Sequence, residues 1–262
     1  GAGIPTGQIV FKVDGTSVYT TTLGFGTPGE ATYTTSPGDA TTLKPAGNHN
    51  ITATYSGDNH FTCTTCTSPN YVQIVLRADT QVTIQSPLLI VDFGQQVQIT
   101  AIVSAIQPGA GTITGTIVFS VNAFPVYTVT LDGTTPSGTY STNLLPIGIN
   151  AVCAQYLYGT NPNFYNSLQV CVTITVNKAQ TKTSLTSAPN PSNFGQTAVF
   201  SATVTPAGAS TSTITPTGTV TFTFNSTGYM TGTLTQGVTT VVTNTLPAGT
   251  YSVKADYGGD GN

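Results

Sequence analysis

The stretch LPAGTYSVKADY, residues 246–257, decides the fold. After its glycine, apolar and aromatic residues alternate with polar ones, the first set being Tyr251, Val253, Ala255 and Tyr257. Successive side chains of a β-strand point to opposite faces, so a period of two predicts a half-buried strand with one apolar face. The Pro-Ala-Gly in front of it is typical of a turn that leads into a strand.

The same pattern occurs twice more at constant spacing. The sequences LKPAG, LLPIG and TLPAG place Gly47, Gly148 and Gly249 at steps of 101 residues. Each glycine is followed eight residues later by a tyrosine, namely Tyr55, Tyr156 and Tyr257. FGQ at 93–95 returns at 194–196, and RADT from Arg77 is matched by KAQT from Lys178, again 101 residues apart. We interpret the glycines as turn markers and the tyrosines as core markers of a repeat of about 100 residues.

Each repeat contains several further segments with a period of two and none with a convincing helical period. Their expected inward-facing sets are Ile9, Phe11, Val13; Ile117, Phe119, Val121; Val220, Phe222, Phe224; Val97, Ile99, Ala101, Val103; and Ala198, Phe200, Ala202, Val204. About 100 residues with roughly seven short strands are typical of an immunoglobulin-like β-sandwich. The sequence therefore predicts an all-β fold of tandem immunoglobulin-like β-sandwiches, stacked end to end as a rod.

The repeat divides the chain into three units, which we call unit 1 (residues 1–78), unit 2 (79–178) and unit 3 (179–262). Relative to unit 2, we expect unit 1 to lack its first strands and unit 3 to lack its last. A sheet that lacks a strand exposes unpaired backbone groups, which recruit another strand. Two explanations stay open: the chain is an excerpt of a longer array, or subunits complete one another by exchanging strands. The junctions RADTQV and NKAQTK contain neither Gly nor Pro, which favours stiff connections.

The motifs NPSNFGQTAVFSATVTP, PTGTVTF and LPAGTYSVKADYGGDGN, with the junction VNKAQTKTSL, resemble the bacterial and archaeal Ig-like repeats found in tandem in large surface proteins. The resemblance spans essentially the whole chain. Unit 3 fits best, whereas unit 2 departs from the pattern with YLYGTNPNF after its strand. The resemblance implies an extracellular stalk, adhesin or structural array, and it implies no shared catalytic residues.

Composition argues against several classes of function. Charged residues make up 6% of the chain, and the six Lys and Arg form no basic stripe that could neutralise nucleic-acid phosphates. We see no apolar run long enough to span a membrane. Glu30 is the only glutamate and His49 and His60 are the only histidines. Without a recognisable catalytic or phosphate-binding motif, we expect a protein that is not an enzyme and binds no cofactor.

The four cysteines favour disulfides. Cys153 and Cys171 lie out of phase with the inward-facing residues of two strands that should be antiparallel neighbours, so we expect both on the outer face as a cross-strand disulfide. By chain entropy, closing this loop contributes about 3 kcal/mol. Cys63 and Cys66 form CTTC without the helical context of a redox motif, and a small loop disulfide is preferred over free thiols. Disulfides indicate an extracytoplasmic setting.

Other polar residues leave alternatives open. Asp58 and Asp260 occupy equivalent turns, where a side chain that bonds its own backbone explains them without calcium. Calcium at a junction, through Asp79 or Asp92, stays open, although we expect no metal site. Asn50 and Asn225 begin Asn-x-Thr/Ser triplets and are candidate glycosylation acceptors.

These observations give two hypotheses of function. The first is a non-catalytic extracellular or cell-surface structural protein, a stalk or filament of stacked Ig-like repeats. Its partners would be copies of itself or neighbouring repeats, including strands supplied by adjacent segments or subunits. The alternative is an adhesin module that recognises glycans or a surface protein through loops.

Overall fold

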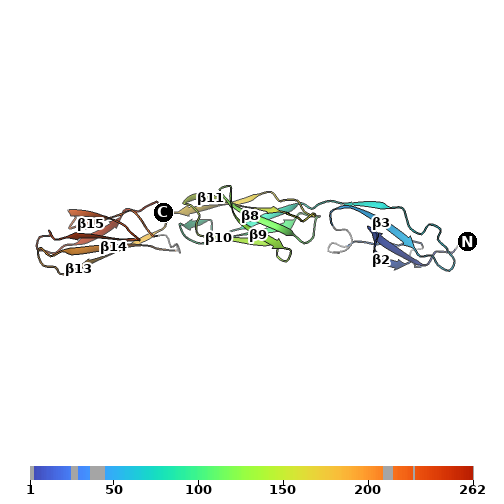
Figure 1. Ribbon diagram of the computed structural model, residues 1–262, viewed down its shortest axis with the longest axis horizontal. Coiled ribbons are helices and arrows are strands. Elements are labelled where there is room, and N and C mark those ends of the chain that lie inside the picture. Colours follow the sequence, from blue (N-terminus) through green and yellow to red (C-terminus); the bar gives the residue numbers. More distant parts are fainter. Residues whose placement is uncertain (1–2, 25–28, 36–44, 209–214, 227, 262) are drawn as a thin grey trace.

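The computed structural model describes residues 3–24, 29–35, 45–208, 215–226 and 228–261, and every helix or strand within them is a β-strand (Figure 1). The strands form three groups that follow one another along the long axis of the molecule. This architecture confirms the all-β fold class. The exact boundaries of units 1, 2 and 3 stay predictions.

Unit 2 is built from two sheets. A three-stranded sheet has the order β10-β7-β5, and a five-stranded sheet has the order β6-β12-β11-β8-β9. The strands are β5 (Thr80–Gln85), β6 (Ile90–Asp92), β7 (Val97–Ala105), β8 (Thr114–Val121), β9 (Phe124–Asp132), β10 (Ser137–Thr142), β11 (Gly148–Leu157) and β12 (Val170–Asn177). β6 pairs in parallel with β12, whereas the other neighbours are antiparallel. It is an eighth strand beyond the seven expected, because the chain crosses from one sheet to the other after β5.

The core of unit 2 lies between its two sheets and consists of the alternating residues that the sequence indicates. Phe119 of β8 and Tyr156 of β11 are fully buried. The remaining members of the cluster include Val97, Ile99, Ala101, Val103, Ile117, Val152, Ala154, Ile174 and Val176. Each large apolar side chain buried in this way contributes about 1.5–3 kcal/mol to folding, so this cluster is a main source of stability for unit 2.

Unit 3 repeats this plan with two three-stranded sheets, in the orders β13-β14-β17 and β16-β15-β18. Its strands are β13 (Thr181–Ala188), β14 (Ala198–Pro206), β15 (Thr219–Phe224), β16 (Gly228–Thr233), β17 (Val238–Thr243) and β18 (Val253–Tyr257). The rings of Phe200 and Phe224 meet edge to face within its core, at 5.0 Å between centroids.

Unit 1 shows one four-stranded sheet in its described residues, with the order β2-β1-β3-β4. The strands are β1 (Gln8–Val13), β2 (Thr16–Thr22), β3 (Gly47–Tyr55) and β4 (Tyr71–Val75). The residues of the expected inward-facing set on β1 are covered to different extents: Val13 is buried, and Ile9 and Phe11 are half-buried. The cover over Phe11 comes from Tyr19 and Tyr33, whose rings stack on each other at 5.0 Å.

Candidate functional site: the clasps and junctions of the units

The chemistry-bearing side chains are dispersed. Among the residues that the structure describes, no three His, Cys, Asp or Glu side chains gather as metal ligands. In these residues, therefore, no cluster of ligands supports calcium binding through Asp79 or Asp92. In the same described ranges, no helix is long and apolar enough to cross a bilayer. The features that return at the repeat spacing are a clasp inside each unit and the junctions between units.

The marker tyrosines form the clasp, which joins the end of one strand to the start of its neighbour. The Tyr156 hydroxyl donates to the carbonyl oxygen of Thr114 at 2.6 Å, and the Tyr257 hydroxyl donates to that of Thr217 at 2.7 Å. Burial raises the pKa of Tyr156, which fits a neutral donor. In unit 1 the Tyr55 hydroxyl donates instead to the carboxylate of Asp58 at 3.0 Å.

Asp58 and Asp260 complete the clasp. In unit 1, Oδ2 of Asp58 accepts from the backbone N–H and the hydroxyl of Thr6, and Oδ1 accepts from the N–H groups of His60 and Phe61. The Thr6 N–H is the largest reason why the pKa of Asp58 is far below its usual range. Asp260 accepts the same pair of bonds from Thr217, at 2.8 and 2.9 Å. Asp58 therefore closes its own turn, as expected, and also bonds Thr6. The expectation for Asp260 is met differently, because its carboxylate bonds the distant Thr217.

Unit 2 makes the clasp with an amide. The Asn161 side chain donates to the Thr114 hydroxyl at 2.8 Å. Asn161 thus bonds the clasp threonine in place of the carboxylates of the other units. The glycine after each clasp threonine lets the strands approach closely. A Cβ on Gly115 (φ 131°) would lie 2.5 Å from the Leu157 carbonyl oxygen. The unusual YLYGTNPNF loop of unit 2 thus preserves the contact with different chemistry.

Each turn-marker glycine lies two residues after a proline. The carbonyl oxygen of that proline is hydrogen-bonded to the side chain of the residue four positions after the proline. Nε2 of His49 lies 2.7 Å from the Pro45 oxygen, Nδ2 of Asn150 donates to that of Pro146 at 2.7 Å, and the Tyr251 hydroxyl donates to that of Pro247 at 3.0 Å. Three residue types at one repeat position thus fasten the same turn. Gly47, Gly148 and Gly249 stand between these partners, with φ of 150°, 104° and 159°.

The structure joins Cys153 and Cys171 in a disulfide across directly paired positions of β11 and β12. Both lie outside the core cluster, on the outer side of the sheet. Although it lies on this outer side, Cys153 is buried, with only 5% of it exposed. The cause is Ser120 of β8, which pairs with Cys153 and accepts a hydrogen bond from the Gln169 side chain.

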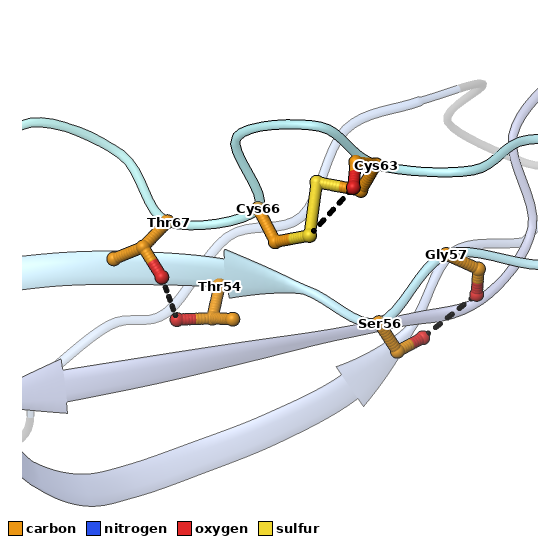
Figure 2. Close-up of a disulfide and its surroundings, with 6 residues drawn as sticks. All are labelled: Thr54, Ser56, Gly57, Cys63, Cys66 and Thr67. Atoms are coloured by element: carbon orange, nitrogen blue, oxygen red, sulfur yellow. Dashed lines mark hydrogen bonds between the residues drawn. A yellow bond between two sulfur atoms is a disulfide. The ribbon is translucent and has the colours of Figure 1, made fainter.

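A second disulfide joins Cys63 and Cys66 in the loop after β3 (Figure 2). The end of this loop returns to β3: the Tyr55 N–H donates to the Cys66 carbonyl oxygen at 2.7 Å, and the hydroxyls of Thr54 and Thr67 are 3.0 Å apart. The disulfide therefore fixes a loop that extends the sheet beyond β3.

The two candidate glycosylation acceptors differ in their surroundings. Asn50 is exposed on β3. Asn225 is also exposed, but its side chain is engaged, because its Oδ1 accepts from the Ser252 N–H at 2.8 Å. Thr227, the third residue of the Asn225 triplet, lies outside the described residues.

At the junctions, a cation from the linker reaches the loop that follows the clasp tyrosine of the next unit. The Arg77 guanidinium lies over the rings of Tyr158 and Tyr165, at 5.0 and 5.6 Å from their centroids. The Lys178 ammonium, 101 residues later, donates to the Asp260 carbonyl oxygen at 2.5 Å. The end of the described chain accordingly lies back at the junction with the central group of strands (Figure 1).

Backbone hydrogen bonds fix the linkers as well. The Ile106 N–H donates to the Asp79 carbonyl oxygen at 2.8 Å, and the equivalent Ala207 N–H donates to that of Gln180 at 2.7 Å. Ala78 bonds in both directions to the loop of unit 2, through the Asn163 carbonyl oxygen at 2.8 Å and the Tyr165 N–H at 3.0 Å. A linker with both backbone groups paired has little freedom to bend.

A cavity of about 650 Å³ opens beside the first junction. Its lining includes Ala46 of unit 1, Arg77 of the linker and Asn163 of unit 2. At its edge the Ala46 N–H donates to the Asn163 side-chain oxygen at 2.7 Å, which connects the two units directly. Sequence reasoning missed this bond, because Asn163 has no counterpart in the repeat pattern. The paired Arg77 and Lys178 were visible, but their targets were not.

Comparison with known proteins agrees with this architecture. The sequence profile of the family described as Bacterial Ig-like domain (group 3) matches residues 1–75 and 185–262, together more than half of the chain. No curated protein sequence matches.

Three solved structures are similar to this chain, but their TM-scores are too low to support a conclusion about its fold or function. One holds the fibronectin(III)-like modules of Clostridium thermocellum CbhA: 15% identity, 68% of this chain and 82% of that chain, TM-score 0.30. Another is the Escherichia coli adhesin FdeC, with 15% identity over 82% of this chain and 70% of that chain and a TM-score of 0.27. A third is Escherichia coli alpha-2-macroglobulin activated by porcine elastase, with 10% identity over 94% of this chain and 26% of that chain and a TM-score of 0.32.

Proposed function

Because the chain belongs to the bacterial Ig-like domain (group 3) family, we propose that it is a non-catalytic structural protein, part of a stalk or filament of Ig-like units stacked end to end. Its task is mechanical: to span distance outside the cell while resisting bending. The sandwiches supply the resistance to extension, since unfolding one means breaking a whole ladder of hydrogen bonds and exposing its apolar core.

The observation that carries this proposal is the repeated junction. Arg77 and Lys178 stand at the same repeat position, and each contacts the same loop of the following unit. A cation–π contact contributes about 0.5–1 kcal/mol at an exposed site and more when partly buried, and Arg77 is half-buried. Together with the paired linker backbone, such contacts favour one inter-unit angle over a range of angles.

Small-angle X-ray scattering of the full chain tests this role. We expect a pair-distance distribution of one extended particle for the wild type. The double variant Arg77→Ala and Lys178→Ala should broaden it towards bent shapes, because each linker loses its side-chain anchor. Lys182→Ala is the matched control, since it removes an exposed charge from β13 without touching a linker. Equal flexibility of all three proteins would contradict the proposal.

The disulfides support an extracellular or cell-surface location. Cytosolic thiols are generally kept reduced, whereas secreted proteins retain such cross-links. Two disulfides in a chain that has four cysteines leave no free thiol. Fractionation of the native cells, followed by labelling of surface proteins, checks this placement. Recovery of the reduced chain in the cytosol would count against it.

Neighbouring copies of the chain are the partners we propose, and one surface favours lateral contact. Val72 and Ile74 of β4 pair with Asn50 and Asn48, on the side of the sheet away from His49, and are 49% and 58% exposed. Their equivalents on β12 are the polar Thr173 and Thr175. An apolar outer strand with so little charge nearby is suited to association.

A further inference from the structure

The turn at Pro45–Ala46 is fastened differently from its two counterparts, by an ionisable side chain. The His49 ring is 5% exposed, with Nδ1 2.8 Å from the Asp14 carboxylate and Nε2 2.7 Å from the Pro45 carbonyl oxygen. Both partners are acceptors. A neutral imidazole donates only one hydrogen bond, so the ring satisfies both partners only as the imidazolium.

The corresponding contacts of the other units carry no charge at ordinary pH. In unit 2 an amide pair takes the place of His49 and Asp14: the Asn122 side chain donates to Oδ1 of Asn150 at 3.0 Å, and Asn150 donates to the Pro146 oxygen. In unit 3 the Tyr251 hydroxyl alone reaches the Pro247 oxygen. Of the three equivalent turns, only that of unit 1 depends on a proton that solution pH can remove.

This turn also contacts the next unit. Ala46, directly after Pro45, is the residue whose N–H donates to the Asn163 side chain of unit 2. Proton loss at His49 leaves a lone pair facing an acceptor oxygen on one side of the ring. The carbonyl of Pro45 or the carboxylate of Asp14 then loses its donor, and the Pro45–Ala46 peptide loses its fixed position.

We propose that His49 and Asp14 form a proton-operated latch on the Pro45–Ala46 turn, closed when the imidazole is protonated and loosened when it is neutral. Through the bond between Ala46 and Asn163, the latch sets how firmly unit 1 is fixed to unit 2. It regulates the junction of the proposed rod and in that respect rests on the proposed function.

Among the described residues, few other charged groups lie around His49. Gln73 of β4 stands opposite it, and the described residues of β2 carry no charge. On β1, Lys12 pairs with Thr52, and beyond the turn Arg77 and Asp79 line the cavity beside Ala46. The hydrogen bond to Asp14 is the main cause that raises the pKa of His49 above 6.5, and the Pro45 carbonyl adds to it.

The sign of the pH dependence follows. Because the folded-state pKa of His49 is raised, the latch contributes fully below about pH 6.5 and is lost as the pH rises through the folded pKa. The pKa of Asp14 is lowered, chiefly by its bond to His49, so its contribution is present above pH 3.8 and is lost as the pH falls through its folded pKa. The latch is therefore closed between the lowered folded-state pKa of Asp14 and the raised folded-state pKa of His49.

Amide hydrogen exchange at Ala46 tests the latch in the full chain, with the ring of His49 titrated by NMR in the same samples. His60→Asn removes the second histidine signal. The control is the double variant Asp14→Asn with His49→Asn, which installs the amide pair of unit 2. Comparing the two proteins at each pH cancels the chemical pH dependence of exchange.

We expect the protection of Ala46 in the wild type to fall by roughly three- to tenfold, the range for one hydrogen bond, as His49 loses its proton. The double variant should show no such step. Wild-type protection that does not change across the His49 titration, or the same step in the double variant, would overturn the proposal. X-ray scattering at pH 5 separates the proposed rod from the proposed latch. A flexible chain at that pH would contradict the rod, whereas the exchange of Ala46 alone tests the latch.

Discussion

The hydroxyl of Tyr156 donates a 2.6 Å hydrogen bond to the carbonyl oxygen of Thr114 from a ring that is fully buried. Thr114 begins β8 and Tyr156 stands near the end of β11, so the bond fastens the two strands where their pairing ends. Tyr257 makes the same bond to Thr217 at 2.7 Å, but its ring is only partly covered. One contact thus occurs in two environments.

Replacing Tyr156 with Phe should lower the free energy of unfolding of unit 2 by about 1–3 kcal/mol, because the Thr114 carbonyl oxygen loses its donor in a buried setting. Tyr257→Phe should cost less, since water can replace the hydroxyl there. Urea unfolding followed by tyrosine fluorescence and NMR measures both. The interpretation fails if the Tyr257 variant loses as much as the Tyr156 variant.

Removing the disulfide of unit 2 by Cys153→Ser and Cys171→Ser should cost about 3 kcal/mol, because an 18-residue loop regains its freedom in the unfolded chain. The Cys63–Cys66 disulfide closes a loop with a sequence separation of only 3. Removing it by Cys63→Ser and Cys66→Ser should therefore cost about 2 kcal/mol or less by the same entropy. Thermal unfolding of the two double variants gives the comparison. A larger loss in the Cys63 pair would show that loop entropy is not the main effect.

Gly115→Ala should destabilise unit 2 strongly. Its backbone has φ 131°, and the added methyl group would meet the Leu157 carbonyl oxygen at 2.5 Å. Gly148→Ala is the matched control, with φ 104° and open space around the new methyl group. Both variants incur the backbone strain, and only Gly115→Ala adds overpacking of about 1–3 kcal/mol. Equal melting temperatures for the two would contradict the close approach of strands at the clasp.

Much of the fold could be predicted from residue spacing. The alternating sets on β7 and β8, with the core marker Tyr156 of β11, identified the core of unit 2 because its two sheets cover each other. The same reasoning did not show that Ile9 and Phe11 are only half-buried, since a pattern shows which side a residue faces but not what covers it. The pattern also placed Cys153 correctly on the outer face, but it gave no sign that this position is buried. The Gln169 side chain, which bonds the neighbouring Ser120, comes from a loop.

The junctions were harder to predict from sequence. The recurrence of Arg77 and Lys178 was visible as a spacing of 101 residues. Their partners differ, however, because one cation meets two aromatic rings and the other a backbone carbonyl oxygen. Similarly, His49, Asn150 and Tyr251 perform one task with three chemistries. Residue identity alone gives no signal for such equivalence, whereas the shared carbonyl acceptor does.

The Asp58 clasp should make unit 1 sensitive to acid. The Thr6 N–H lowers the pKa of Asp58, so the contribution of the carboxylate is present above pH 3.8 and is lost as the pH falls through the lower folded pKa. Asp58→Asn should reduce the melting temperature at pH 7 and flatten its decline in acid. Calorimetry from pH 7 to pH 2 measures both slopes. Parallel slopes for variant and wild type would refute this role of Asp58.

Lateral association through β4 predicts a variant with weaker self-association. Val72→Thr with Ile74→Thr places the side chains of β12 on the outer face of β4, and threonine retains the preference for a strand. Sedimentation velocity over a range of concentrations should show wild-type oligomers that the variant lacks. Thr173→Val with Thr175→Ile on β12 tests the reverse change. If wild type and the first variant sediment alike at all concentrations, β4 is not the contact.

Backbone ¹⁵N relaxation of the full chain tests the central claim, that the units form one stiff rod, most directly. The account predicts that the amides of β3, β8 and β15 fit a single, strongly elongated diffusion tensor, because both linkers are fixed by Arg77 and Lys178 and by their own backbone bonds. Separate and faster tumbling of each unit, as for beads on a flexible string, would contradict it.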